Sequence, residues 1–252
     1  MIMLKKHESV AYELLRPEQV REIRAKSPIA YIPAGSLEWH GFQNPLGTDG
    51  LKAHAICCEA ALRHGGVVLP PFYQGLLGKG WGPLGWGGYT LGYNKEGTFE
   101  SAILGICRAL VAAKWRVIVG VTGHDVPEQR AAMARAIRKA TRNSRGSGGF
   151  ALMEGDLHRA DRKIPYHMDH AGAWETSCMM HAYPDKVRLH SLRSRKKTPG
   201  DDLDIRGPEG IGGRNPLKYA SARLGRRIIE RMGDLIGARA RAMLLGRRKL
   251  YT

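Results

Sequence analysis

The stretch Arg116-Val-Ile-Val-Gly-Val-Thr-Gly-His-Asp125 decides the fold class of this chain. Its first six residues include four β-branched side chains, and after Arg116 no polar residue interrupts the run before Thr122. A short, continuous apolar run of this kind is typical of a strand covered on both faces, as in a parallel sheet. We therefore predict a buried parallel strand over residues 116–121.

Further strands and helices alternate on both sides of this run. Apolar segments predict strands at Ile29–Ala34, Val67–Leu69 and Phe150–Met153. Amphipathic segments separate them and predict helices over residues 17–26, 50–64, 98–114 and 128–142, with a long helix around 224–235. Such alternation predicts an α/β fold with a mainly parallel sheet covered by helices.

The net charge of +17 invites a nucleic-acid or acidic-membrane partner. This excess is regional, because residues 128–145 carry +5 and residues 187–252 carry +11, which leaves +1 on the rest of the chain. No helix-turn-helix, zinc-finger or RNP-like signature accompanies the basic stretches, so we expect no specific nucleic-acid partner. We interpret the excess of basic residues as charge on solvated helix faces and on a basic tail at 245–252. A narrower role is also open, in which this charge attracts an anionic substrate toward the site.

The apolar runs are too short to span a bilayer, and the amino-terminal residues lack a secretory pattern. We therefore expect a cytoplasmic protein without a membrane partner. The four cysteines form no C-x-x-C pair and are expected to be reduced and mostly buried.

Glycine occupies nine of the 23 positions from 75 to 97, which excludes a regular helix there. Trp81 and Trp86 stand among these glycines and are predicted to contact substrate, because aromatic side chains in a surface loop can fold over a flat ligand. A packed structural loop or an oligomer contact is an equally open interpretation. The G-x-G-x-x-G match at 80–85 contains a proline and follows no strand, so it predicts no dinucleotide site.

Candidate metal ligands follow the first predicted strand. Glu38 and His40 are two residues apart, so in an extended segment both side chains can face one point beyond the strand's carboxyl end. Open α/β sheets bind ligands at that edge. Asp49 comes nine residues after His40, although an aspartate just before a helix also serves as an N-cap.

Two more polar clusters strengthen the metal hypothesis. His124 follows the strand at 116–121, and Asp169-His170-Ala-Gly-Ala-Trp174-Glu175 precedes a predicted helix. Carboxylates and imidazoles in such a mixture suit zinc or manganese.

These segments resemble the creatininase (creatinine amidohydrolase) family of metal-dependent hydrolases. Pro33–Asp49 is similar to its P-x-G-S-x-E-x-H-G…T-D segment, His170–Ser177 to H-A-G-x-x-E-T-S, and Gly210–Gly225 to G-x-x-G…P…A-S-x-x-x-G. The resemblance implies a three-layer α/β/α single domain over residues 1–252 and a homo-oligomer, with a hexamer favoured. It also implies two divalent ions per subunit, zinc and/or manganese, with iron as a further option.

The resemblance also implies residue roles. Glu38 and His40 would each bind one of two metals, Asp49 would bridge them, and His124 would complete the first site. His170 would be the catalytic acid/base, and Trp174 is expected to contact substrate.

One position departs from the family pattern. Creatininase has a metal-binding glutamate two residues after the histidine, where this chain has Val126. Glu175, expected to take part in catalysis as well, is favoured over Asp125 as the replacement ligand. A weak or empty second site is the other possibility.

The leading prediction is therefore a metal-dependent hydrolase that cleaves a C–N bond of a small cyclic or formyl amide with a metal-activated water. One alternative is a metal-dependent ring-opening hydrolase of a non-amide cyclic carbonyl compound of the keto-polyol type. Another is a catalytically impaired binding protein of the same fold.

Overall fold

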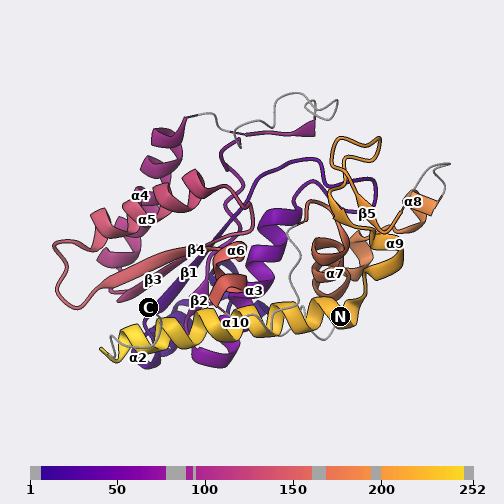
Figure 1. Cartoon of the computed structure of the whole chain (residues 1–252). Helices are drawn as coiled ribbons and strands as arrows, with labels where there is room; N and C mark the ends of the chain where they lie inside the picture. The colour runs from indigo at the N-terminus through magenta and orange to yellow at the C-terminus, as the bar shows by residue number, and fades with distance from the viewer. Residues whose placement is uncertain (1–6, 78–88, 93–94, 161–168, 194–199, 247–252) are drawn as a thin grey trace.

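The computed structural model describes residues 7–77, 89–92, 95–160, 169–193 and 200–246. Its centre is a four-stranded parallel sheet with the order β2-β1-β3-β4 (Figure 1). The strands are β1 (Ile29–Ala34), β2 (Val67–Val68), β3 (Val117–Thr122) and β4 (Gly148–Met153).

The register of the sheet brings three strand ends level with one another. Ala34, the last residue of β1, pairs with Thr122, and Thr122 pairs with Met153, the last residue of β4. The residues that follow these three strands therefore leave the sheet side by side at its carboxyl edge.

Helices cover both faces of the sheet, as predicted for a three-layer α/β/α fold. Ile29 and Tyr31 of β1 pack into the core beneath α3 (Thr48–His64), α7 (Ala173–Ala182) and α10 (Ala222–Leu244). Their neighbours Ala30 and Ile32 point the other way, into the core beneath α4 (Glu96–Ala112) and α5 (Pro127–Thr141). Figure 1 shows α10 on one side of the strands and α4 with α5 on the other. The predicted fold class is confirmed, and a single domain over residues 1–252 stays a prediction.

The main elements lie close to their predicted positions. The helix α2 (Pro17–Lys26) and β1 have the predicted bounds, and most other elements begin within two residues of theirs. The helix α4 ends earlier than expected, because Lys114 adopts a positive φ of 69° that turns the chain toward β3. Residues 148 and 149 extend β4, since both pair with β3 although they are glycines.

Short elements connect the layers, and their patterns are too brief to predict from sequence. They are η1 (Tyr12–Leu14), α6 (Glu154–Ala160), η3 (Pro184–Lys186), α8 (His190–Arg193), β5 (Asp202–Leu203), β6 (Gly213–Arg214) and α9 (Pro216–Tyr219).

The helix α10 packs along α3 and α7, which lie on the same face of the sheet. It begins where the Ser221 side chain accepts a hydrogen bond from the Leu224 amide. A Cβ at Gly225 would lie 1.8 Å from the Ser177 carbonyl oxygen, so only glycine permits this approach to α7. The close approach of α10 and α7 helps to fix α7, whose first turn carries Glu175.

The basic stripes on α5 and α10 are solvated helix faces, as expected. Arg138 and Lys139 on α5 are exposed, and so are Arg223, Arg227 and Arg231 on α10. Residues 247–252 of the predicted basic tail lie outside the described residues.

The four cysteines are buried and free, in agreement with the prediction of reduced thiols. Among the helices of the described residues, none is long and apolar enough to cross a membrane. A cytoplasmic location stays a prediction.

Candidate functional site

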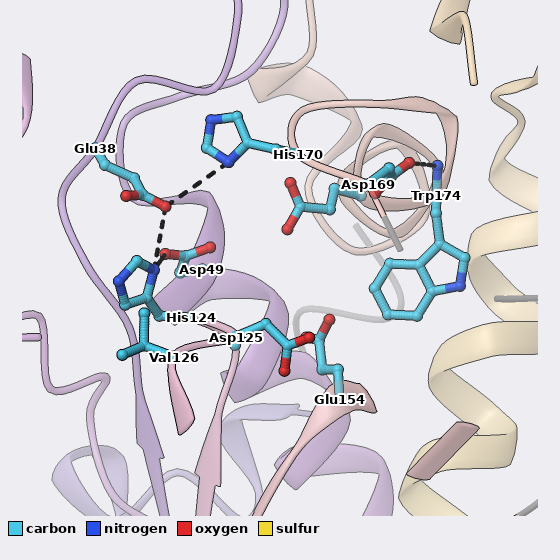
Figure 2. Close-up of a pocket in the computed structure, with 11 residues that line it drawn as sticks. Glu38, Asp49, His124, Asp125, Val126, Glu154, Asp169, His170 and Trp174 are labelled. Atoms are coloured by element: carbon cyan, nitrogen blue, oxygen red, sulfur yellow. Dashed lines mark hydrogen bonds and ion pairs between the residues drawn. The ribbon is translucent and has the colours of Figure 1, made fainter. Parts of the chain in front are cut away.

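A pocket lies at the carboxyl edge of the sheet, where the three predicted clusters come together (Figure 2). Six of the eleven residues that line it are acidic, and none of these eleven is a lysine or arginine. The lining consists of Glu38, Asp49, Gly123, His124, Asp125, Val126, Glu154, Asp169, His170, Trp174 and Glu175. This acidic lining does not favour the anionic substrate that the net charge suggested.

A close contact between β1 and α3 brings Asp49 to the end of the strand. A Cβ at Gly35 would lie 2.3 Å from the Gly50 amide nitrogen, so glycine lets the start of α3 touch the chain just after β1. Asp49 then accepts a hydrogen bond from the Ser36 amide at 3.3 Å. No side-chain hydrogen bond caps α3, so the open alternative of an N-cap role for Asp49 has no support.

Backbone carbonyls orient the three histidines of the site. A carbonyl oxygen only accepts, so His40 donates from Nδ1 to the Glu38 carbonyl at 3.1 Å, and His124 donates from Nε2 to the Leu76 carbonyl at 2.8 Å. His170 donates from Nε2 to the Trp39 carbonyl at 2.6 Å. In the neutral ring, each remaining nitrogen carries a lone pair, which is the arrangement found in metal-binding histidines.

The first ligand group contains Glu38, Asp49 and His124. The Nδ1 atom of His124 lies 3.2 Å from Glu38 Oε1 and 3.1 Å from Asp49 Oδ2. The three ligand atoms lie within 4.8 Å of one another. This spacing suits a divalent cation.

The second ligand group contains His40, Asp49 and Glu175. The Nε2 atom of His40 lies 3.1 Å from Asp49 Oδ1 and 3.4 Å from Glu175 Oε2. Asp49 therefore directs one carboxylate oxygen toward each group, as a bridging ligand requires. The lone pair of His40 Nε2 is buried, faces two carboxylates and accepts no hydrogen bond from the described residues, so a cation between them fits this donor set.

Glu175, which the sequence favoured over Asp125 as the replacement ligand, lies in the second ligand group. Its Oε2 atom accepts a hydrogen bond from the Ala171 amide at 2.7 Å. Ala171 has a φ of 56°, an uncommon conformation for a residue other than glycine. Asp125 lines the pocket but is exposed and belongs to none of the ligand groups among the described residues.

The charges of the two groups shift the pKa values of their members. Burial alone would lower the pKa of His40, but the carboxylates of Asp49 and Glu175 raise it to about 10. Burial opposes ionisation of Asp49, yet His40 and His124 hold the pKa of this carboxyl well below its usual value. His40 and His124, whose pKa values are both raised by the carboxylates of the two groups, are therefore held in the protonated form.

His170 lies beside both groups. Its ring centroid is 4.5 Å from that of His40, and its Nδ1 atom is 3.9 Å from Glu38 Oε1. Burial and the neighbouring His40 lower the pKa of His170 below 6.5, so its ring is neutral near pH 7. Glu38, His40 and His170 also form a possible ligand group, so the geometry alone permits either a catalytic or a ligand role.

Lys52 and Glu154 also belong to the site, although no role was predicted for them from the sequence. Lys52 is fully buried, bonds to Glu175, and lies 3.0 Å from Glu154 Oε2. Lys52 follows Asp49 by three residues, which places both on one face of α3. Glu154 directly follows β4, so the rule that identified His124 after β3 would also have identified Glu154.

Of the three tryptophans predicted to contact substrate, Trp81 and Trp86 lie outside the described residues. Trp174 lines the pocket, and its amide donates to Asp169 Oδ2 at 2.6 Å. The Nζ atom of Lys52 lies 5.2 Å from the centroid of its ring.

Fold and site together define an α/β protein with a carboxylate–histidine centre at the carboxyl edge of a parallel sheet. Residues 13–239 match the creatininase family, described as creatinine amidohydrolase. The chain therefore belongs to the creatininase family. Since this is a family of amidohydrolase enzymes, the prediction of an enzyme of this kind is confirmed.

Two relatives are each 27% identical to this chain over the aligned residues. One is the mycofactocin precursor peptide peptidase of Mycolicibacterium smegmatis, aligned over 73% of this chain and 69% of the relative. The other is the creatinine amidohydrolase of Pseudomonas putida, aligned over 70% of this chain and 73% of the relative.

Solved creatininase structures share the fold. One of them, a creatinine amidohydrolase, has a TM-score of 0.70 at 24% identity and covers 92% of this chain and 98% of its own. Others include a Zn-Zn type and a manganese form of creatininase.

Proposed function

We propose that this protein hydrolyses a C–N bond of a small cyclic or formyl amide with two divalent cations, held by Glu38, His40, Asp49, His124 and Glu175. The observation that carries the proposal is the position of Asp49, with one oxygen 3.1 Å from His40 and the other 3.1 Å from His124. Zinc and manganese are the proposed ions, because solved creatininases include a Zn-Zn type and a manganese form.

The cations, when bound, lower the pKa of water toward neutrality and polarise the substrate carbonyl. The protein residues have separate tasks around them. Glu38, His40 and His124 hold the cations from the β1 and β3 ends, and Glu175 holds its cation from α7.

We assign His170 to proton transfer. The hydrogen bond to the Trp39 carbonyl fixes its ring, with Nδ1 on the side of Glu38. Because its pKa is lowered, the neutral ring can accept a proton near pH 7 and return it to the leaving nitrogen.

Amide substrates are favoured over keto-polyols by the names of both relatives, a peptide peptidase and a creatinine amidohydrolase. Hydrolysis of a panel of creatinine, formyl amides and short peptides, before and after chelation of metal, tests this proposal. We expect turnover of at least one amide that disappears on chelation and returns with zinc or manganese. Activity that survives complete metal removal contradicts the proposal, and turnover of cyclic keto-polyols alone supports the ring-opening alternative.

We also propose a homo-oligomer, with a hexamer favoured by the family resemblance. Light scattering of the purified protein measures this directly, and a monomer at micromolar concentration would contradict it.

A further inference from the structure

One wall of the pocket has carboxylates that the proposed mechanism does not use. Figure 2 shows Glu154, Asp125 and Asp169 across the pocket from Glu38 and His124. We refer to Glu154 and Asp169 as the acidic wall.

Glu154 is held rigidly in this wall. It follows Met153, the last residue of β4, and its residue surface is only 2% exposed. Its Oε2 atom lies 3.0 Å from the buried Lys52 ammonium, which also bonds to Glu175. Lys52 therefore fixes the direction in which the other oxygen of Glu154 points.

Two oxygens of the acidic wall are buried acceptors for which the described residues supply no donor. Glu154 Oε1 and Asp169 Oδ1 accept no hydrogen bond within the described part of the chain. The second oxygen of Asp169 accepts from the Trp174 amide at 2.6 Å. Buried polar atoms are nearly always satisfied in native proteins, so these two oxygens indicate a ligand that donates hydrogen bonds.

The charge of the wall indicates what kind of donor it takes. Lys52 is a single positive charge shared between Glu154 and Glu175. Glu154, Asp169 and Glu175 line the same pocket, and none of the eleven described residues that line it is a lysine or an arginine, so these carboxylates repel one another. A positively charged ligand would relieve this repulsion.

A metal ion is not the favoured occupant. None of the possible ligand groups found among the described residues contains Glu154 or Asp169. Both residues line the same pocket as the proposed metal ligands. An organic cation that shares the pocket with the scissile amide satisfies these observations.

We infer that Glu154 and Asp169 form a binding subsite for a cationic, nitrogen-containing donor group of the substrate, such as an amidinium, a guanidinium or a primary ammonium. The inference rests on the proposed function, because it places the scissile carbonyl at the cations and the nitrogen group at the acidic wall. Glu154 is then a specificity-determining residue of the reaction.

Methylguanidinium and N-methylurea test this subsite as matched probes. They have nearly the same shape, but the urea has a carbonyl oxygen where the guanidinium has a donor, and it carries no charge. We expect the zinc-loaded protein to bind methylguanidinium at least about tenfold more tightly in calorimetric titration, since hydrogen bonds to charged groups are the stronger ones. Equal affinity for the two probes overturns the inference.

The substitution Glu154→Gln removes the charge at constant size. It should abolish most of the methylguanidinium preference and leave the bound zinc unchanged. Glu100→Gln, which makes the same change at an ion pair with Arg135 and Lys139 of α5, is the control and should keep the preference. Glu154→Asp keeps a counter-ion for Lys52 and should give an intermediate preference. A preference that is unchanged in Glu154→Gln overturns the inference.

The test of this subsite can fail independently of the test of the proposed function. Probe binding needs no turnover, and zinc content is measured independently. If the protein binds zinc and hydrolyses amides but does not prefer methylguanidinium, only the subsite inference is wrong. If it prefers methylguanidinium but shows no metal-dependent turnover, only the proposed function is wrong.

Discussion

The two sides of the pocket use the same carboxylate chemistry in different ways. On the histidine side, Glu38 and Asp49 face His124 Nδ1, and Asp49 also faces His40 Nε2. The other nitrogen of each ring donates to a backbone carbonyl. On the acidic wall, Glu154 faces a lysine, which remains protonated because its carboxylate partners keep its pKa raised against the effect of burial. A cation that binds an imidazole nitrogen can displace its proton into water, whereas this lysine keeps its proton. The histidine side is therefore suited to metal, and the wall to a donor group of a substrate.

The largest effect that separates the two sides is expected for Asp49→Ala. Because Asp49 has one oxygen in each ligand group, its loss should remove most metal from both positions and lower amide turnover by more than about a hundredfold. Metal analysis of the purified protein measures this effect. Asp185→Ala, at an exposed ion pair, is the control. A full metal complement in Asp49→Ala would contradict the assignment.

His170→Ala should separate chemistry from metal binding. We expect turnover to fall by about 10²–10⁴-fold, the usual contribution of a general acid or base, with the metal retained. His190→Ala, an exposed histidine on α8, should change neither quantity. Joint loss of metal and turnover would make His170 a ligand.

Lys52→Met tests the link between the two sides. Lys52 holds Glu175, so the affinity of the second metal equivalent should fall by about 10–100-fold while the first equivalent remains. Two buried carboxylates would also lose their partner, which should reduce the free energy of unfolding by about 3–5 kcal/mol. Chelator competition and thermal unfolding measure these effects, with Lys139→Met as the exposed control. If the affinity for the second metal equivalent is unchanged in Lys52→Met, Lys52 contributes to stability alone.

The smallest expected effect is a pH dependence of metal affinity. Since the pKa of His40 in the metal-free protein is raised to about 10, His40 is protonated at neutral pH and must lose its proton when metal binds. Lower pH favours the proton, so affinity should rise with pH, by up to about tenfold per unit for each proton displaced. Metal titrations at pH 6, 7 and 8 measure this slope, and an affinity that falls with rising pH would contradict the protonation scheme.

Much of the histidine side could be predicted because each of its residues stands next to a strong local pattern. Glu38 and His40 follow β1, and His124 follows β3, whose apolar runs are evident in the sequence. Glu154 and Asp169 also stand at marked positions, directly after β4 and directly before His170, but the sequence does not show which atoms they face. Lys52 lies within α3 like an ordinary surface lysine, and only the tertiary structure shows that it is buried.

The choice between Glu175 and Asp125 shows the same limit. Both residues lie next to a candidate histidine or helix start, and spacing along the chain does not separate them. The packing of α10 against α3 and α7 contributes to placing Glu175 beside His40, while Asp125 stays exposed.

The sequence by itself determined the α/β fold, the order of its principal elements and the residues of the histidine side, because buried strands and the polar turns after them are local properties. The tertiary structure alone decided that Glu175 faces His40, that Lys52 joins Glu175 to Glu154, and that two wall oxygens find no donor among the residues the structure describes. These contacts join residues as far as 135 positions apart, as for His40 and Glu175, and only the packing of helices on the sheet fixes their distances and their electrostatic environment.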